Sequence, residues 1–99
     1  MDKDRFELWL LKKYNNTHVV SDAISRSKRI EEGLDINLDH EYDNDRCKHI
    51  LEVFKYSKED EEFNKPTPNG IIIKGNLYNG MASLRNAIRR YIEFRQSRN

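Results

Sequence analysis

Apolar residues recur at helical spacing most clearly near the end of the chain, between Asn79 and Arg98. With successive residues placed 100° apart, seven of them fall on one arc of about 160°. These are Met81, Leu84, Ala87, Ile88, Tyr91, Ile92 and Phe94. The pattern predicts a long amphipathic helix that buries this arc. Either Asn76 or Asn79 can cap its first turn.

The same periodicity predicts shorter helices earlier in the chain. They cover residues 4–14, 18–32, 45–56 and 58–64. Asp4 and Glu7 have the spacing of a capping box for the first of them. Thr17 is the expected N-cap of the second, and Gly33 is the residue expected to end it. The fourth is short and is predicted from capping, not from periodicity: Ser57 is its expected cap, acidic residues follow in the first turn, and Phe63 is its one candidate for burial.

Two segments lack this periodicity. Residues 35–45 are rich in Asp, Asn and Glu, and we expect an acidic loop there. Residues 65–80 contain Pro66, Pro68 and a Gly-Asn turn pair. The β-prone run at residues 71–73 leaves two alternatives, a small β excursion near residues 71–78 or an extended loop whose isoleucines enter the core. We favour the loop. The predicted fold is all-α, a compact four- to five-helix bundle in one domain over residues 1–99.

Composition fits a folded domain with a thin core, because 36% of the 99 residues are hydrophobic and 35% are charged. Cys47 is the only cysteine, so no internal disulfide can form, which is typical of a reducing, cytoplasmic compartment. We interpret Cys47 as a small buried apolar residue; the alternative is a nucleophile. The apolar run near the start is too short and interrupted for a signal peptide or membrane span.

Charge is unevenly distributed along the chain. Residues 1–32 carry a net charge of +1, residues 33–64 carry −6, and residues 65–99 carry +6. The last third holds seven Lys or Arg and one Glu. Such a split indicates either two opposed surfaces or neutralisation of one segment by another.

The acidic segment partly matches a calcium-binding loop. Asp35, Asn37 and Asp39 fit the first three ligand positions of an EF-hand. His40, however, stands where the sharp turn needs glycine, and Arg46 stands where a bidentate glutamate is needed. We therefore interpret the segment as a solvated stretch with capping aspartates and expect no metal site.

No constellation typical of an enzyme is recognisable. His18, His40 and His49 lack zinc-ligand spacing, and Cys47 and His49 point to different sides of one predicted helix. There is also no glycine-rich phosphate loop and no nuclease-type carboxylate motif. We expect no catalytic residues and no cofactor.

Basic residues on the second and last predicted helices are the remaining signal. They are Arg26, Lys28, Arg29, Arg85, Arg89 and Arg90. Arginine suits phosphate binding because its planar fork donates to two phosphate oxygens. The alternative is that these residues form solvated faces that pair with the acidic middle third.

Three stretches together resemble a known kind of domain. They are FELWL at residues 6–10, the segment Thr17–Ile30, and Ser83–Phe94. They are similar to the small helical N-terminal domain of bacterial restriction-endonuclease-like proteins and to the core-binding (SAM-like) domain of phage integrases and tyrosine recombinases. The resemblance implies a helical bundle that packs against one side of a duplex, with the basic helices in contact. Arg26, Lys28, Arg29, Arg85 and Arg89 match those helices.

These observations predict a non-enzymatic module that engages the backbone of double-stranded DNA, as part of, or derived from, a restriction or recombination protein. The alternative is a small phage-type inhibitor, an anti-defence protein in a host–virus interaction. Its acidic stretches at residues 35–45 and 59–62 would then face the basic channel of a nuclease complex.

Overall fold

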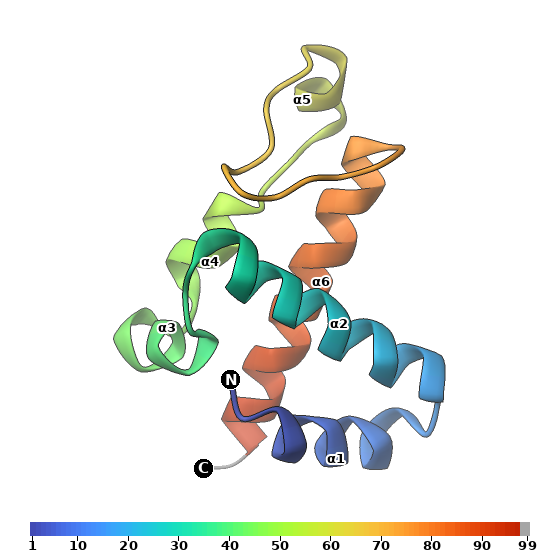
Figure 1. Cartoon of the computed structure of the whole chain (residues 1–99), viewed down its shortest axis with the longest axis vertical. Helices are drawn as coiled ribbons and strands as arrows, with labels where there is room; N and C mark the ends of the chain where they lie inside the picture. Colours follow the sequence, from blue (N-terminus) through green and yellow to red (C-terminus); the bar gives the residue numbers. More distant parts are fainter. Residues whose placement is uncertain (98–99) are drawn as a thin grey trace.

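The computed structural model describes residues 1–97, which form six helices (Figure 1). They are α1 (Lys3–Tyr14), α2 (Thr17–Leu34), α3 (Leu38–Asp45), α4 (Lys48–Val53), α5 (Lys58–Glu62) and α6 (Leu77–Ser97). The all-α prediction is confirmed, with six helices where four to five were expected. Residues 1–97 contain no strand, so the alternative of a β excursion near residues 71–78 is wrong. The segment before α6 is a loop.

The first two helices begin earlier than predicted. The N-cap of α1 is Asp2, whose carboxylate accepts from the Arg5 amide at 3.4 Å, so the predicted capping box at Asp4 is wrong. The N-cap of α2 is Asn16, whose Oδ1 accepts from the amides of His18 and Val19 at 2.9 and 3.2 Å. Asn is at least as good a cap as Thr, which is why the helix starts one residue before the expected position.

Gly33 was expected to end α2, but it does not. The helix continues to Leu34 and ends on Asp35, which has a left-handed φ of 55°. A Cβ at Gly33 would lie 2.6 Å from Ile71 Cδ1 and 2.7 Å from the Gly70 carbonyl oxygen. The glycine is therefore needed for the close approach of the loop before α6, which places Ile71 in the core.

The acidic stretch after α2 is mostly helix and not the predicted loop. Asn37 caps α3 by accepting from the Asp39 amide at 2.8 Å. Leu38 and Tyr42, four residues apart, are buried on one face of the helix. The carboxylates of Asp39 and Glu41 lie in the first turn, where the helix dipole favours negative charge. Local acidity therefore supports this helix.

The single helix predicted over residues 45–56 is interrupted. Arg46 and Cys47 both have a positive φ, at 61° and 64°, and this turn separates α3 from the shorter α4. The turn allows Tyr42 before it and Ile50 after it to reach the same core. It also buries the Cys47 side chain completely.

The short fourth helix is confirmed as α5, with boundaries close to those predicted. Ser57 and Asp60 form a capping box, in which the Asp60 amide donates to Ser57 Oγ at 3.1 Å and the Ser57 amide donates to Asp60 Oδ2 at 2.8 Å. The expectation that Phe63 is buried is wrong, because its side chain is 83% exposed. Phe63 follows the last residue of α5, and its side chain is exposed to solvent.

The core forms where α2 crosses α6 and where α1 lies beside the second half of α6 (Figure 1). The predicted arc of α6 is confirmed for Met81, Leu84, Ala87, Ile88, Tyr91 and Phe94, all buried, whereas Ile92 is half-buried. The Phe6 ring of α1 lies 5.5 Å from the Tyr91 ring, edge to face, and 5.2 Å from the Phe94 ring. Aromatic pairs of this kind add to the stabilisation from burial.

Candidate nucleic-acid interface

A hollow whose charged lining residues are all cationic lies between α2, α6 and the loop before α6. Its volume is about 520 Å³. The lining residues are Arg26, Arg29, Ile72, Ile73, Lys74, Gly80, Ser83 and Leu84. We call it the basic hollow. It lies between the second and last helices, but α6 contributes Gly80, Ser83 and Leu84 to its lining and none of the arginines predicted on that helix.

Two glycine contacts set the position of the loop that closes the basic hollow. Gly33 of α2 meets Gly70 and Ile71 of the loop. A Cβ at Gly80 of α6 would lie 2.4 Å from Ile73 Cγ2, so the loop packs closely against this helix as well. Lys74 follows directly, and the loop therefore carries it to the rim beside the arginines of α2.

The cations of the basic hollow have little counter-charge. Arg26 makes one ion pair, with Asp22 at 3.7 Å, and both side chains are solvent-accessible, at 36% and 56%. An exposed pair of this kind contributes little to stability. The side chains of Arg29 and Lys74 have no hydrogen-bond or ion-pair partner within residues 1–97. The hollow thus retains positive charge that an anion can use.

Arg90 extends the same side of α6. It follows Ser83 by seven residues, which places it two turns further along, roughly 10.5 Å along the axis, at nearly the same angle. Its guanidinium lies 5.1 Å from the centre of the Tyr14 ring, a cation–π contact that orients it without neutralising it. Arg90 can therefore contact a second phosphate beside the basic hollow.

The other predicted binding residues lie elsewhere. Lys28 lines a groove of about 630 Å³ between α1 and α2, whose charged residues are of both signs. Arg85 lines a third hollow, of about 430 Å³, and Arg89 is exposed one turn further on that side of α6. The six predicted residues therefore do not form one face. Arg26 and Arg29 share the basic hollow, and Arg90 lies on the side of α6 that borders it.

Lys74 was missed by the sequence analysis. It lies between an isoleucine run and Gly75, in a loop with no periodicity. Its placement depends on contacts between residues far apart in the chain, namely the approach of Gly70 to Gly33. The excess of basic residues in the last third of the chain was the only sequence signal that included Lys74.

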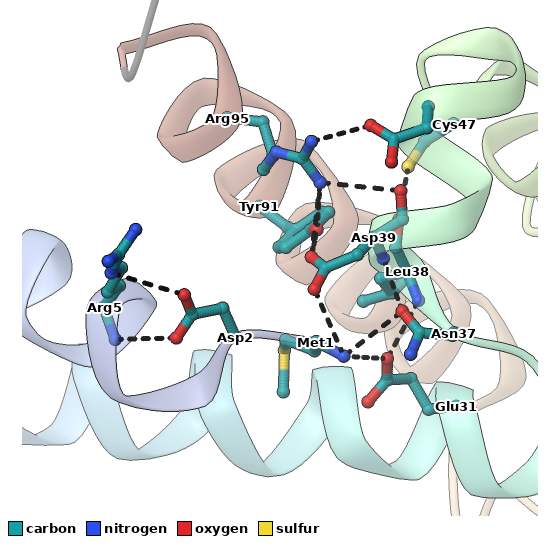
Figure 2. A network of polar contacts seen from close by, with 11 residues as sticks. Met1, Asp2, Arg5, Glu31, Asn37, Leu38, Asp39, Cys47, Tyr91 and Arg95 are labelled. Carbon is teal, nitrogen blue, oxygen red and sulfur yellow. Dashed lines mark hydrogen bonds and ion pairs between the residues drawn. The ribbon is translucent and has the colours of Figure 1, made fainter.

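The acidic α3 is neutralised by Arg95, which the sequence analysis did not single out (Figure 2). Its guanidinium lies 3.3 Å from Asp39 Oδ1 and 2.8 Å from Asp43 Oδ1. The Tyr91 hydroxyl also donates to Asp39. Burial raises the pKa of Tyr91, and its hydrogen bond to Asp39 acts in the same direction. Within residues 1–97, none of the six predicted basic residues forms an ion pair with the acidic middle third, so the pairing in that alternative is wrong for them. That they form solvated faces stays an alternative prediction.

The terminal amine of Met1 completes this network (Figure 2). Its nitrogen lies 3.0 Å from Glu31 Oε2 and 3.7 Å from Asp39 Oδ2, and it donates to Asn37 Oδ1 at 3.3 Å. Glu31 Oε2 also accepts from the Leu38 amide at 2.8 Å. The end of α2 and the start of α3 are thereby held together by charge-assisted hydrogen bonds.

Cys47 occupies a closed position, as predicted. Its side chain has no exposed surface, and Sγ donates to the Leu38 carbonyl oxygen at 3.9 Å. Burial raises the pKa of the thiol to about 12, with further contributions from the nearby carboxylates of Asp45 and Glu41. A thiol in this state is a poor nucleophile at neutral pH.

Two features are absent from residues 1–97. Within residues 1–97, no three His, Cys, Asp or Glu side chains are placed to share a metal ion. In the same part of the chain, none of the helices combines the length and apolar character needed to cross a bilayer.

Comparison of the chain with family models, with curated proteins and with solved structures gives no match. The resemblance to restriction-endonuclease-like and recombinase domains thus stays a prediction. The geometry of the basic hollow carries the functional argument.

Proposed function

We propose that the protein is a non-enzymatic module that binds the phosphate backbone of double-stranded DNA through the basic hollow and Arg90. The observation that supports this most strongly is the convergence of Arg26, Arg29 and Lys74 on one hollow with no carboxylate in its lining. Two separate elements, α2 and the loop before α6, supply these cations, so the positive charge does not belong to one helix alone. A role within a restriction or recombination protein remains part of the proposal.

The mode of binding follows from the chemistry of these side chains. Arginine donates from a planar fork to two phosphate oxygens, and lysine adds a point charge at the rim. Contacts to phosphate position a protein on a duplex without reading its sequence. We therefore expect recognition of shape and charge, with a dissociation constant of about 10⁻⁴–10⁻⁶ M at physiological salt.

Charge reversal at the basic hollow tests the proposal. The double variant R26E/R29E should lose duplex binding by about a hundredfold or more at low salt, because two attractive contacts become repulsive. Fluorescence anisotropy with a labelled duplex measures this, and circular dichroism checks the fold.

The matched control is K12E/K48E, which changes the net charge equally. Both lysines are exposed, and they lie on α1 and α4, away from the basic hollow. The control should retain most of the affinity. Equal losses in the two variants would mean that net charge, and not this surface, governs binding, and the proposal would be abandoned.

The second candidate function, inhibition of a nuclease complex, has its support at α5. Phe63 is 83% exposed, and the side chains of Glu59 and Glu62 are exposed without partners within residues 1–97. An exposed aromatic residue beside negative charge is a suitable anchor for a basic protein surface. If this candidate is correct, a purified nuclease complex freed of nucleic acid should bind the wild type and R26E/R29E equally, and Phe63→Ser should lose the binding.

A further inference from the structure

Arg85 is an arginine of α6 with a buried donor that lacks a hydrogen-bond acceptor. Its Nε–H is buried, yet no acceptor lies within hydrogen-bond distance of it. Arg90 on the same helix rests on the Tyr14 ring, and Arg95 pairs with two aspartates. Removing part of a guanidinium from water without supplying an acceptor is unfavourable. An anion at the terminal N–H groups would offset the cost of this partial burial of the guanidinium charge.

The space in front of Arg85 can hold such an anion. Arg85 lines a hollow of about 430 Å³, together with Lys55 from the segment after α4 and Lys65 from the segment after α5. We call this the Arg85 hollow. Lys55 is exposed and has no ion-pair partner within residues 1–97. The volume exceeds that of a single phosphate group and falls within the range of small-molecule sites.

The Arg85 hollow is lined by three cations and two carboxylates, which leaves an excess of one positive charge. Asp60 is committed to α5, since it accepts from the Ser57 amide at 2.8 Å and lies 3.8 Å from Lys65 Nζ. The Ser57 backbone hydrogen bond lowers the pKa of Asp60, which keeps it ionised and in its capping role. Glu52 lines the hollow but makes no ion pair with Arg85 or Lys55.

This hollow is separate from the basic hollow. Ser83 and Arg85 are two residues apart on α6, so their side chains project about 200° apart around the helix. Ser83 faces the basic hollow and Arg85 faces α4 and α5. A ligand in one hollow therefore leaves the other open.

We propose that the Arg85 hollow binds the phosphate group of a small molecule, with Arg85 and Lys55 as its main contacts. Arg85 offers the terminal N–H groups of its guanidinium to the phosphate oxygens, and Lys55 supplies a second positive charge. Lys65 closes the rim. The remaining space accommodates the small body that carries the phosphate.

Nuclear magnetic resonance of the arginine Nε–Hε groups tests this in the intact protein. The Arg85 signal is assigned by its loss in Arg85→Lys, and inorganic phosphate is titrated at constant ionic strength. We expect the Arg85 signal to move in a saturable manner, whereas the exposed Arg89 signal, one turn away, stays in place. Glycerol phosphate should bind more tightly than inorganic phosphate if the ligand is a phosphate ester.

Three variants serve as controls. Lys55→Gln, at an exposed position, should weaken phosphate binding by about tenfold. Glu52→Gln should strengthen it, because a competing carboxylate is removed. R26E/R29E should bind phosphate here as the wild type does, even where it has lost duplex binding, so this proposal and the DNA proposal fail independently.

Three outcomes would overturn the proposal. One is an Arg85 signal that does not respond to phosphate. Another is a linear response shared with Arg89, which indicates a general ionic effect. The last is a shift of the Arg85 signal in the Glu52→Gln variant without phosphate, followed by no further change when phosphate is added. That result would make Glu52 the partner of Arg85 in solution.

Discussion

The network around Asp39 and the basic hollow use charge in opposite ways. In the network, Arg95, the Met1 amine and the Tyr91 hydroxyl all meet the carboxylate of Asp39. In the basic hollow, Arg29 and Lys74 lack a partner within residues 1–97. Within residues 1–97, the opposite charges of the middle and last thirds pair around Asp39 and at Lys65–Asp60, but not at the basic hollow. Paired charge holds the fold together, and unpaired charge marks the surface available to a ligand.

The largest predicted contrast between the two regions is in thiol reactivity. With a pKa raised to about 12, the Cys47 thiol should react with iodoacetamide at pH 8 about a thousandfold more slowly than an exposed thiol. A cysteine introduced at Ile72, which is 73% exposed on the rim of the basic hollow, provides the comparison in the same molecule. Mass spectrometry should find label on the introduced cysteine only. Rapid labelling of Cys47 in the native protein would show that the region is open.

The same pKa shift sets the direction of a pH effect on stability. The folded state holds the Cys47 proton more tightly than the unfolded chain, whose thiol has a pKa near 9.0. The free energy of unfolding should therefore be unaffected by this group below pH 9.0 and should fall as the pH rises toward about 12. Urea denaturation across this range measures the change.

Removal of the central carboxylate should break the network. Asp39→Ala leaves the buried Tyr91 hydroxyl without its acceptor and Arg95 without one of its partners. We expect a loss of about 3 kcal/mol in the free energy of unfolding, measured by chemical denaturation. Asp43→Ala, which removes a mostly exposed carboxylate from the same arginine, should cost less than about 1 kcal/mol. Similar losses for both would contradict the central place of Asp39.

The loop that closes the basic hollow can be displaced without touching its charges. Gly33→Ala puts a Cβ 2.7 Å from the Gly70 carbonyl oxygen, so the loop backbone must move. Despite the better helix propensity of Ala, we expect a loss of about 1–2 kcal/mol in stability and weaker duplex binding, because Lys74 moves with the loop. Gly80→Ala should have a smaller effect, since its new Cβ meets only the Ile73 side chain, which can rotate. Unchanged duplex binding by Gly33→Ala would exclude the loop from the site.

The smallest predicted effect comes from the carboxylate that pairs with Arg26. Asp22 is the carboxylate that competes for Arg26. Asp22→Asn should therefore tighten duplex binding by about threefold. Asp4→Asn, at an exposed position on α1, changes the net charge equally and should have less effect. Equal gains would indicate a general charge effect.

The parts of the fold that the sequence predicted correctly are those set by local physics. The buried arc of α6 follows from periodicity, and the start of α5 follows from the Ser57–Asp60 capping pattern. The failure at α3 was avoidable in part, because Asn37 is a good N-cap and the Leu38–Tyr42 pair has helical spacing. The acidic composition, which favours a loop on average, obscured both signals.

The site was predictable only where one helix determines it. Arg26 and Arg29 are three residues apart on α2, and the sequence analysis selected both. Lys74 depends on the contact between Gly33 and Gly70, and no local pattern encodes a contact across that distance in the chain. The angular positions of Arg85 and Arg90 on α6 show that the two side chains point in different directions. Those positions do not show which other elements each side of the helix faces.

The salt dependence of duplex binding by the wild type tests the central claim most directly. Four cations that displace counterions from phosphates should give a slope of roughly −3.6 when the logarithm of the association constant is plotted against the logarithm of the salt concentration. R26E/R29E should reduce the magnitude of this slope by at least about half, as two contacts are lost. A wild type that shows no binding at low salt, or a slope near zero, would contradict the assignment of the basic hollow to DNA.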